Sequence, residues 1–175
     1  MGSEVWGMKK KLTAVILAMT MLTGAIAGCG KTAQTPKLEG SCIDIMNRVY
    51  ETAELDAGLR EAMTYYETTT ITDDREEYIL GTDDVDYTDS AYSAPMMTSV
   101  AYQCVVLRIE PDEDILQTKQ LLLDRADKRK WICVEAESVV VENVGDVILY
   151  VMADKTTADA LKTAFLALGD AQNTK

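Results

Sequence analysis

The stretch VAYQCVVLRI, residues 100–109, decides the fold. It is rich in β-branched residues and nearly continuous in apolar character, which predicts a strand in the middle of a sheet. Pro111 follows at once and ends the strand, because proline has no N–H to donate to a neighbouring strand.

The segment after Pro111 predicts a helix that closes in a basic cluster. Residues 112–114 are all acidic, whereas Arg125 and residues 128–130 are basic. These charges complement the helix dipole at its two ends. Apolar residues such as Leu122 recur at helical spacing and form its buried stripe.

The C-terminal part predicts a hairpin and then a last helix. Residues 138–142 and 146–152 read as strands on either side of a turn at residues 143–145, in which glycine supplies a positive φ. Thr156 opens a capping box for the last helix, and Gly169 fits the position just after its end.

The N-terminal part predicts two helices and a short strand. Ser41 is a good N-cap with Asp44 three residues later, and apolar residues at helical spacing follow. A weaker helical run covers residues 55–63. Residues 77–80 predict a short strand, and the acidic residues 82–89 predict a loop.

Taken in order, these elements predict an α+β domain, with helices packed on one face of a largely antiparallel sheet. We expect a single domain over residues 41–170 and a disordered tail at residues 171–175, since the length suits one hydrophobic core.

The octapeptide AIAGCGKT, residues 25–32, has two interpretations. A phosphate-binding loop would use the Gly-Lys-Thr at residues 30–32. However, Ala25 stands where that loop needs its first glycine, and Pro36 would interrupt the first turn of the helix that must follow. The sequence therefore argues against a phosphate-binding loop.

The second interpretation is an export signal. Three lysines at residues 9–11 precede an uncharged apolar run at residues 12–22, and small residues follow. The segment is short for a transmembrane helix, which needs roughly 20 apolar residues. It ends in Ile26, Ala27, Gly28 and Cys29. These four residues resemble a bacterial lipobox, in which the cysteine thiol receives a diacylglycerol and becomes the mature N-terminus.

We therefore expect a lipoprotein signal peptide at residues 1–28 and a lipid-anchored tether at residues 29–40. The protein would be extracytoplasmic, held to the cell membrane by the lipid on Cys29. Removing residues 1–28 takes Lys+Arg from 17 to 14 and Asp+Glu from 29 to 28, so the net charge changes from −12 to −14. Such an acidic chain argues against nucleic acid as a partner.

The composition also argues against an enzyme. The chain has no histidine, which removes Ser-His-Asp and Cys-His nucleophiles, and no serine has a lysine three residues later. We expect no catalytic residue and no cofactor. Paired-carboxylate chemistry stays open, although abundant acids are also what a solvated surface requires.

The acidic loop invites a calcium interpretation, because Asp84 and Asp86 are spaced like the first ligands of an EF-hand. Asp89 stands where that loop needs glycine, and Pro95 stands where it needs a bidentate glutamate. A solvated loop is therefore favoured, and we expect no metal site.

Three cysteines remain beside Cys29, namely Cys42, Cys104 and Cys133. The number is odd, so at least one thiol is free. A Cys104–Cys133 disulfide is one alternative, and buried free cysteines acting as small hydrophobic residues are the favoured one.

Two features could mark an interaction site. Met96 and Met97 make an apolar approach to the central strand; core packing is the favoured explanation and a partner-binding patch is the alternative. Trp131 follows the basic cluster and either packs against the sheet, which is favoured, or stacks on a ligand.

Four stretches carry a second resemblance. They are TTTITDDREEYILGTDDVDYTDSAYSAPMM, AYQCVVLRIE, DKRKWICV and VVVENVGDVILYVM. Together they resemble the lipoprotein family called domain of unknown function 4358, which occurs in Gram-positive gut anaerobes, over roughly residues 40–155. The resemblance implies an envelope lipoprotein and implies no activity.

The sequence therefore predicts a cell-surface lipoprotein whose domain is a non-enzymatic binding module for another envelope protein or an extracellular polymer. The alternative is a small-solute-binding lipoprotein that serves a transporter. A single short domain argues against the two-lobed clamps that close over solutes, but a single-lobed binder stays open.

Overall fold

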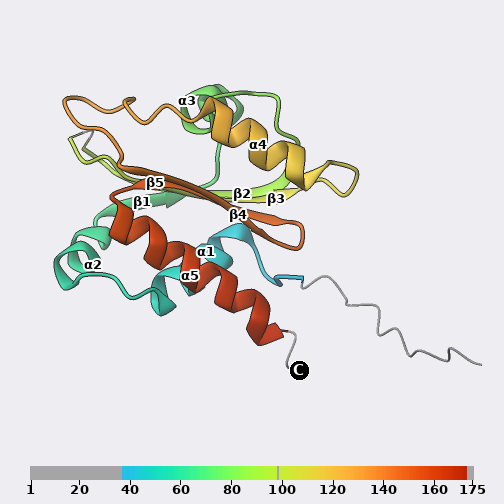
Figure 1. Ribbon diagram of the computed structural model, residues 1–175, viewed down its shortest axis with the longest axis horizontal. Coiled ribbons are helices and arrows are strands. Elements are labelled where there is room, and N and C mark those ends of the chain that lie inside the picture. The colour runs from blue at the N-terminus through green and yellow to red at the C-terminus, as the bar shows by residue number, and fades with distance from the viewer. Residues whose placement is uncertain (1–36, 98, 173–175) are drawn as a thin grey trace, which may run out of the picture. The chain divides into compact units, whose positions relative to one another are not determined.

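The computed structural model describes residues 37–97 and 99–172, which form an α+β domain (Figure 1). Its five strands make one sheet in which every neighbouring pair is antiparallel, in the order β1-β2-β3-β5-β4. The strands are β1 (Tyr66–Thr69), β2 (Tyr87–Pro95), β3 (Gln103–Ile109), β4 (Ser138–Val144) and β5 (Val147–Ala153). The apolar run at residues 100–109 supplies the middle strand, as predicted, although the strand covers only residues 103–109.

Helices cover both faces of this sheet, so the prediction of helices on one face is wrong (Figure 1). One face carries α1 (Cys42–Thr52), α2 (Ala57–Met63) and α5 (Lys155–Gln172). The other carries α3 (Glu76–Leu80), which follows a 3-10 turn (η2, Asp73–Arg75), and α4 (Ile115–Arg125).

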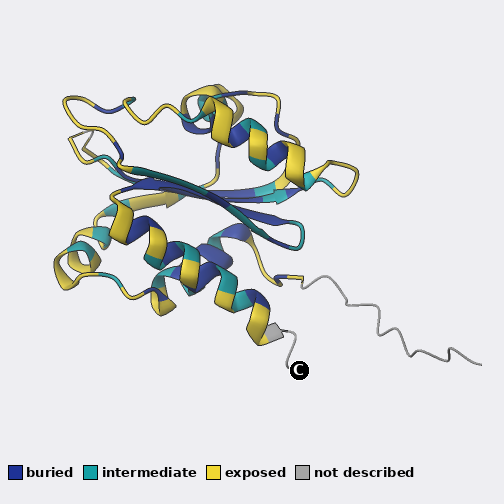
Figure 2. Ribbon diagram, in the orientation of Figure 1, coloured by how far each residue is buried: buried dark blue, intermediate teal, exposed yellow. Residues whose placement is uncertain are grey.

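The reason for two helix layers lies in the alternation of side chains along a strand. Because successive residues point to opposite faces, a strand that is apolar throughout offers both faces for burial. In β3, Val106 joins the core under α1 and α5, whereas Val105 joins the core under α3 and α4. Every residue of β5 is buried. Figure 2 shows this burial running along the sheet and the inner sides of the helices.

The start of the domain follows the predicted capping box. The Ser41 hydroxyl accepts from the Asp44 N–H at 3.1 Å, and the Asp44 carboxylate accepts from the Ser41 N–H at 3.0 Å. Leu38 is fully buried in the core beneath α1, so the folded part begins before Ser41. At the other end, α5 continues past residue 170 to Gln172.

The predicted strand at residues 77–80 is wrong, because these residues form α3. A short apolar run alone does not distinguish helix from strand. Gly81 decides the matter: it ends the helix with φ +82°, and its N–H donates to the Glu77 carbonyl at 3.0 Å. The acidic stretch 82–89 is a loop only in its first part, since β2 begins at Tyr87.

Two details of the C-terminal half also differ from prediction. The hairpin is present, but its two turn residues are Gly145 and Asp146, after Val144 has paired with Val147. Gly169 lies inside α5 rather than beyond its end. A Cβ at this position would lie 2.7 Å from Val144 Cγ1, so the glycine permits close packing of α5 on β4.

Candidate functional site

Exposed apolar side chains gather at one end of the sheet, where β2 ends and β3 begins. Of nine large hydrophobic side chains exposed among the described residues, only Leu116 and Leu123 lie elsewhere, on α4. The other seven define what we call the apolar end: Tyr65, Tyr78, Met96, Met97, Val100, Ile132 and Val134.

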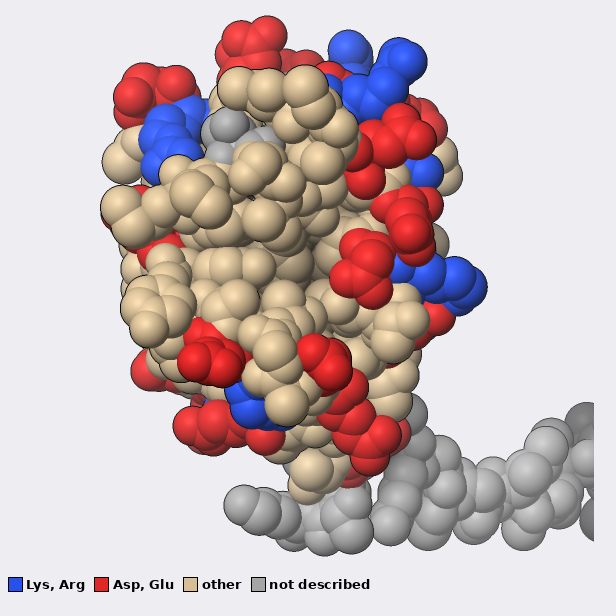
Figure 3. Space-filling model, turned by 90° about the vertical axis from the view of Figure 1, so that its left-hand side faces the viewer, with Lys and Arg blue, Asp and Glu red and all other residues tan. Residues whose placement is uncertain are grey.

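Strand register brings these residues together from distant parts of the chain. Tyr66 pairs with Pro95, which places Tyr65 beside the loop at residues 96–102. Ser138 pairs with Ala153 at the same end, so the loop that carries Ile132 and Val134 lies there too. Figure 3 views this side of the molecule: a broad uncharged area occupies its middle, and charged side chains lie mainly around the border.

The two methionines are exposed, so the favoured explanation of core packing is wrong for them. Met96 is 82% exposed and Met97 is 67% exposed, and both directly follow Pro95, the last residue of β2. Trp131 is only 8% exposed and packs in the core with Leu122, as favoured from the sequence.

Lys130 fastens α3 to the sheet next to the apolar end. Its Nζ donates to the Tyr78 carbonyl at 2.8 Å, the Ile79 carbonyl at 3.3 Å and the Gln103 Oε1 at 2.5 Å. Burial lowers the pKa of Lys130 to about 7. Since the three acceptors occupy the amine, we assign Lys130 a structural role.

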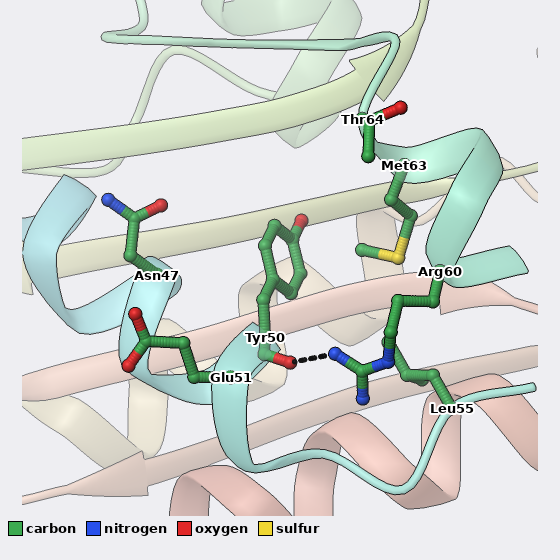
Figure 4. A pocket seen from close by; sticks show the side chains of 7 residues that line it. All are labelled: Asn47, Tyr50, Glu51, Leu55, Arg60, Met63 and Thr64. Atoms are coloured by element: carbon green, nitrogen blue, oxygen red, sulfur yellow. Dashed lines mark hydrogen bonds between the residues drawn. The ribbon is translucent and has the colours of Figure 1, made fainter. Parts of the chain in front are cut away.

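A groove lies between α1 and α2, with a volume of about 320 Å³. It is lined by Asn47, Tyr50, Glu51, Leu55, Arg60, Met63 and Thr64. Figure 4 shows Arg60 reaching across from α2 to the Tyr50 carbonyl, at 3.1 Å from Nη1. Its Nη2 donates to the Ala53 carbonyl at 2.7 Å, so the guanidinium caps the end of α1. We call this the α1–α2 groove.

Aromatic side chains connect the α1–α2 groove with the apolar end. The hydroxyl of Tyr50 lies 2.9 Å from that of Tyr102, and the Tyr102 ring lies 5.0 Å from the Tyr66 ring. Burial raises the pKa of Tyr50 and of Tyr102 well above the ordinary value, so both phenols stay neutral. Met63 lines the groove two residues before Tyr65, which belongs to the apolar end.

A second pocket, of about 260 Å³, adjoins the groove across Leu55. Its acidic lining consists of Glu54, Asp56 and Asp154. Asp56 caps α2 by accepting from the Gly58 N–H at 2.8 Å, and Asp154 caps α5 by accepting from the Thr157 N–H at 2.9 Å. The predicted capping residue Thr156 does not perform this task.

All three cysteines in the described part of the chain are free. Cys42 and Cys104 are buried, and burial raises the pKa of each thiol to about 12. Cys133 is exposed, contrary to the expectation of burial, and has φ +62°. The Cys104–Cys133 disulfide is therefore absent.

Two candidates considered from the sequence remain, the acidic loop at residues 82–89 and the lipobox. Asp89 accepts from the Cys42 N–H at 2.7 Å and so ties α1 to β2. Over residues 37–97 and 99–172, no three His, Cys, Asp or Glu side chains are grouped as a metal would need. The lipobox residues 26–29 and the octapeptide 25–32 lie outside the described residues.

The fold and the site define an α+β domain with an apolar surface at one end of an antiparallel sheet. No known protein family, curated protein or solved structure matches this chain. None of its helices within the described residues has the length and apolar character to span a membrane.

The sequence pointed to part of this surface only. Met96 and Met97 could be proposed because they are adjacent and apolar. The α1–α2 groove was missed, since Tyr50 and Met63 lie on ordinary helical stripes and only the packing of α2 against α1 leaves a hollow between them.

Proposed function

We propose that this protein is a lipoprotein anchored to the outer side of the cell membrane through Cys29, and that its domain binds another envelope protein or an extracellular polymer. The observation that carries the proposal is the apolar end. Seven exposed hydrophobic side chains at one end of a small domain resemble an interaction surface more than the scattered exposure of ordinary surfaces.

The position of residues 38–40, at the start of the described domain, supports this proposal. Arg108, at the opposite end of β3 from Gln103, donates from Nη2 to the carbonyls of Leu38 and Gly40, each at 2.9 Å. The chain therefore enters the domain far from the apolar end. A partner bound at the apolar end would therefore not contact residues 38–40.

Two experiments test the proposal. Labelled palmitate should enter the wild-type protein and fail to enter Cys29→Ala; incorporation into that variant would overturn the anchor.

Crosslinking on intact cells should recover a stoichiometric partner, and Met96→Asp should abolish its recovery. Leu116→Asp is the matched control, because Leu116 is 72% exposed but lies on α4. Equal recovery with both variants would overturn the role of the apolar end.

The α1–α2 groove favours one second candidate, a solute-binding lipoprotein that serves a transporter. Its volume of about 320 Å³ suits a small molecule, although it is open to solvent. A screen of metabolites by thermal shift tests this candidate. A stabilising metabolite whose effect disappears in Asn47→Trp, which fills the groove, would support it.

A further inference from the structure

We propose that the α1–α2 groove, together with the adjoining apolar end, binds a cationic amphipathic peptide segment of a partner protein. This inference rests on the proposed function and names the chemistry of the partner. It is carried by the apolar lining of the groove and by the acidic side chains around it.

The lining offers apolar contact over an extended path. Tyr50, Leu55 and Met63 line the groove, and Tyr65 follows on the apolar end. The Tyr66 ring packs on the Tyr102 ring, and the Tyr102 hydroxyl lies within hydrogen-bond distance of the Tyr50 hydroxyl. These contacts hold Tyr50 in position beneath the groove. A segment with apolar side chains on one face could bury them along it.

The charge beside the path is acidic. Glu51 lines the groove, and Glu54, Asp56 and Asp154 line the adjoining pocket. Arg60 is the one basic residue lining either pocket, and its guanidinium is already occupied by two main-chain carbonyls. The side chains of Glu51 and Glu54 are exposed and make no ion pair within the described residues.

Lysine and arginine side chains suit both the apolar lining and the acidic side chains beside it. Their stems lie along apolar surface while their charged ends reach carboxylates. The four carboxylates are spread over two pockets and form no cluster for a metal ion within the described residues. A ligand that spans both pockets and carries several positive charges is therefore favoured over a single cation.

The test uses the full chain and two labelled probe peptides. Each has about 18 residues, enough for five helical turns. One is built of leucine and lysine in an amphipathic pattern, and the other has glutamate in place of lysine. Fluorescence anisotropy at physiological salt measures binding. We expect the lysine peptide to bind and the glutamate peptide not to bind.

Matched charge variants locate the binding. Glu51→Lys combined with Glu54→Lys should weaken the lysine peptide about tenfold or more, because repulsion replaces attraction at the groove. Asp112→Lys combined with Glu113→Lys makes the same change of net charge at the opposite end of β3, where we expect less than about threefold weakening. All four side chains are exposed, so the fold should survive, which circular dichroism checks.

Three further outcomes would support or overturn parts of this inference. Equal weakening by both pairs would mean attraction by net charge alone and would overturn the inference. Tight binding of the glutamate peptide would overturn the cationic class, while the crosslinking result with Met96→Asp would still decide the proposed function. Site-specific binding of the lysine peptide, with no effect of Met96→Asp on cells, would support the groove and overturn the role of the apolar end.

Discussion

Lys130 gives the domain a pH dependence that can be measured. Burial lowers its pKa from the ordinary 10.5 to about 7. Below pH 7 the amine is protonated in both the folded and the unfolded chain. Between pH 7 and 10.5 the unfolded chain binds more protons, so the free energy of unfolding rises with pH.

Lys130→Met should remove this rise, although it also loses the hydrogen bonds of the amine, which can donate three when protonated and two when neutral. Urea unfolding of both proteins at pH 6.5 and 9 measures the effect. The advantage of wild type over the variant should grow by on the order of 2–3 kcal/mol across that interval. Parallel pH profiles would show that Lys130 stays protonated in the folded state.

Gly169 should tolerate alanine only if Val144 becomes smaller. A Cβ at residue 169 would lie 2.7 Å from Val144 Cγ1. Overpacking of this kind costs about 1–3 kcal/mol, which exceeds the gain of about 1 kcal/mol in helix propensity. Gly169→Ala should therefore lower the free energy of unfolding by chemical denaturation, and adding Val144→Ala should recover part of the loss. Purely additive effects would contradict the contact.

At the scale of elements, the N-cap of α5 is Asp154, and its contribution to stability can be measured separately from that of Thr156. Asp154→Ala should cost about 1 kcal/mol, because it removes the acceptor of the Thr157 N–H. Thr156→Ala should change stability by less than about 0.5 kcal/mol, since Thr156 does not cap the helix. Equilibrium denaturation of the two variants compares them. A larger loss for Thr156→Ala would restore the capping role predicted for Thr156.

Strong local signals predicted the elements well. The capping box at Ser41, the apolar run of β3 and the hairpin at Gly145 depend on neighbouring residues, and each is present. The strand predicted at residues 77–80 was wrong because four residues carry no clear period. Gly81 ends α3 with a positive φ, and a Cβ there would clash with the Arg125 carbonyl, a contact between segments far apart in the sequence.

The layers and the site were harder to predict than the elements. Covering both faces of the sheet follows from β5 being buried at every position, yet which helix covers which face is a property of tertiary packing. The exposure of Met96 has the same origin. Met96 is apolar like a core residue, but it follows the last residue of β2 and is exposed.

For the whole molecule, Cys133 provides a native probe of orientation. It is the exposed thiol of the described residues, while Cys42 and Cys104 are buried with thiol pKa values of about 12. A fluorophore on Cys133 should report weak quenching by quencher lipids when the lipidated protein is bound to vesicles. The seven residues of β3 set the two ends of the sheet about 20 Å apart. If the proposed anchor on Cys29 holds the protein, we expect the end of β3 near Leu38 to lie closer to the membrane than Cys133.

Asp112→Cys in a Cys133→Ser background supplies the comparison for this measurement. A label at residue 112 lies at the same end of β3 as the N-terminal segment, and it should be quenched more strongly. The reverse order would mean that the apolar end faces the membrane.

The central strands β3 and β5 contribute side chains to both hydrophobic cores. We therefore expect the domain to unfold as a single cooperative unit. Neither helix layer can detach without uncovering apolar side chains on strands that the other layer also needs. A partner held by α1 and α2 would therefore slow amide exchange in α4, on the far side of the sheet. Binding at one surface would therefore reduce local opening on both sides of the sheet.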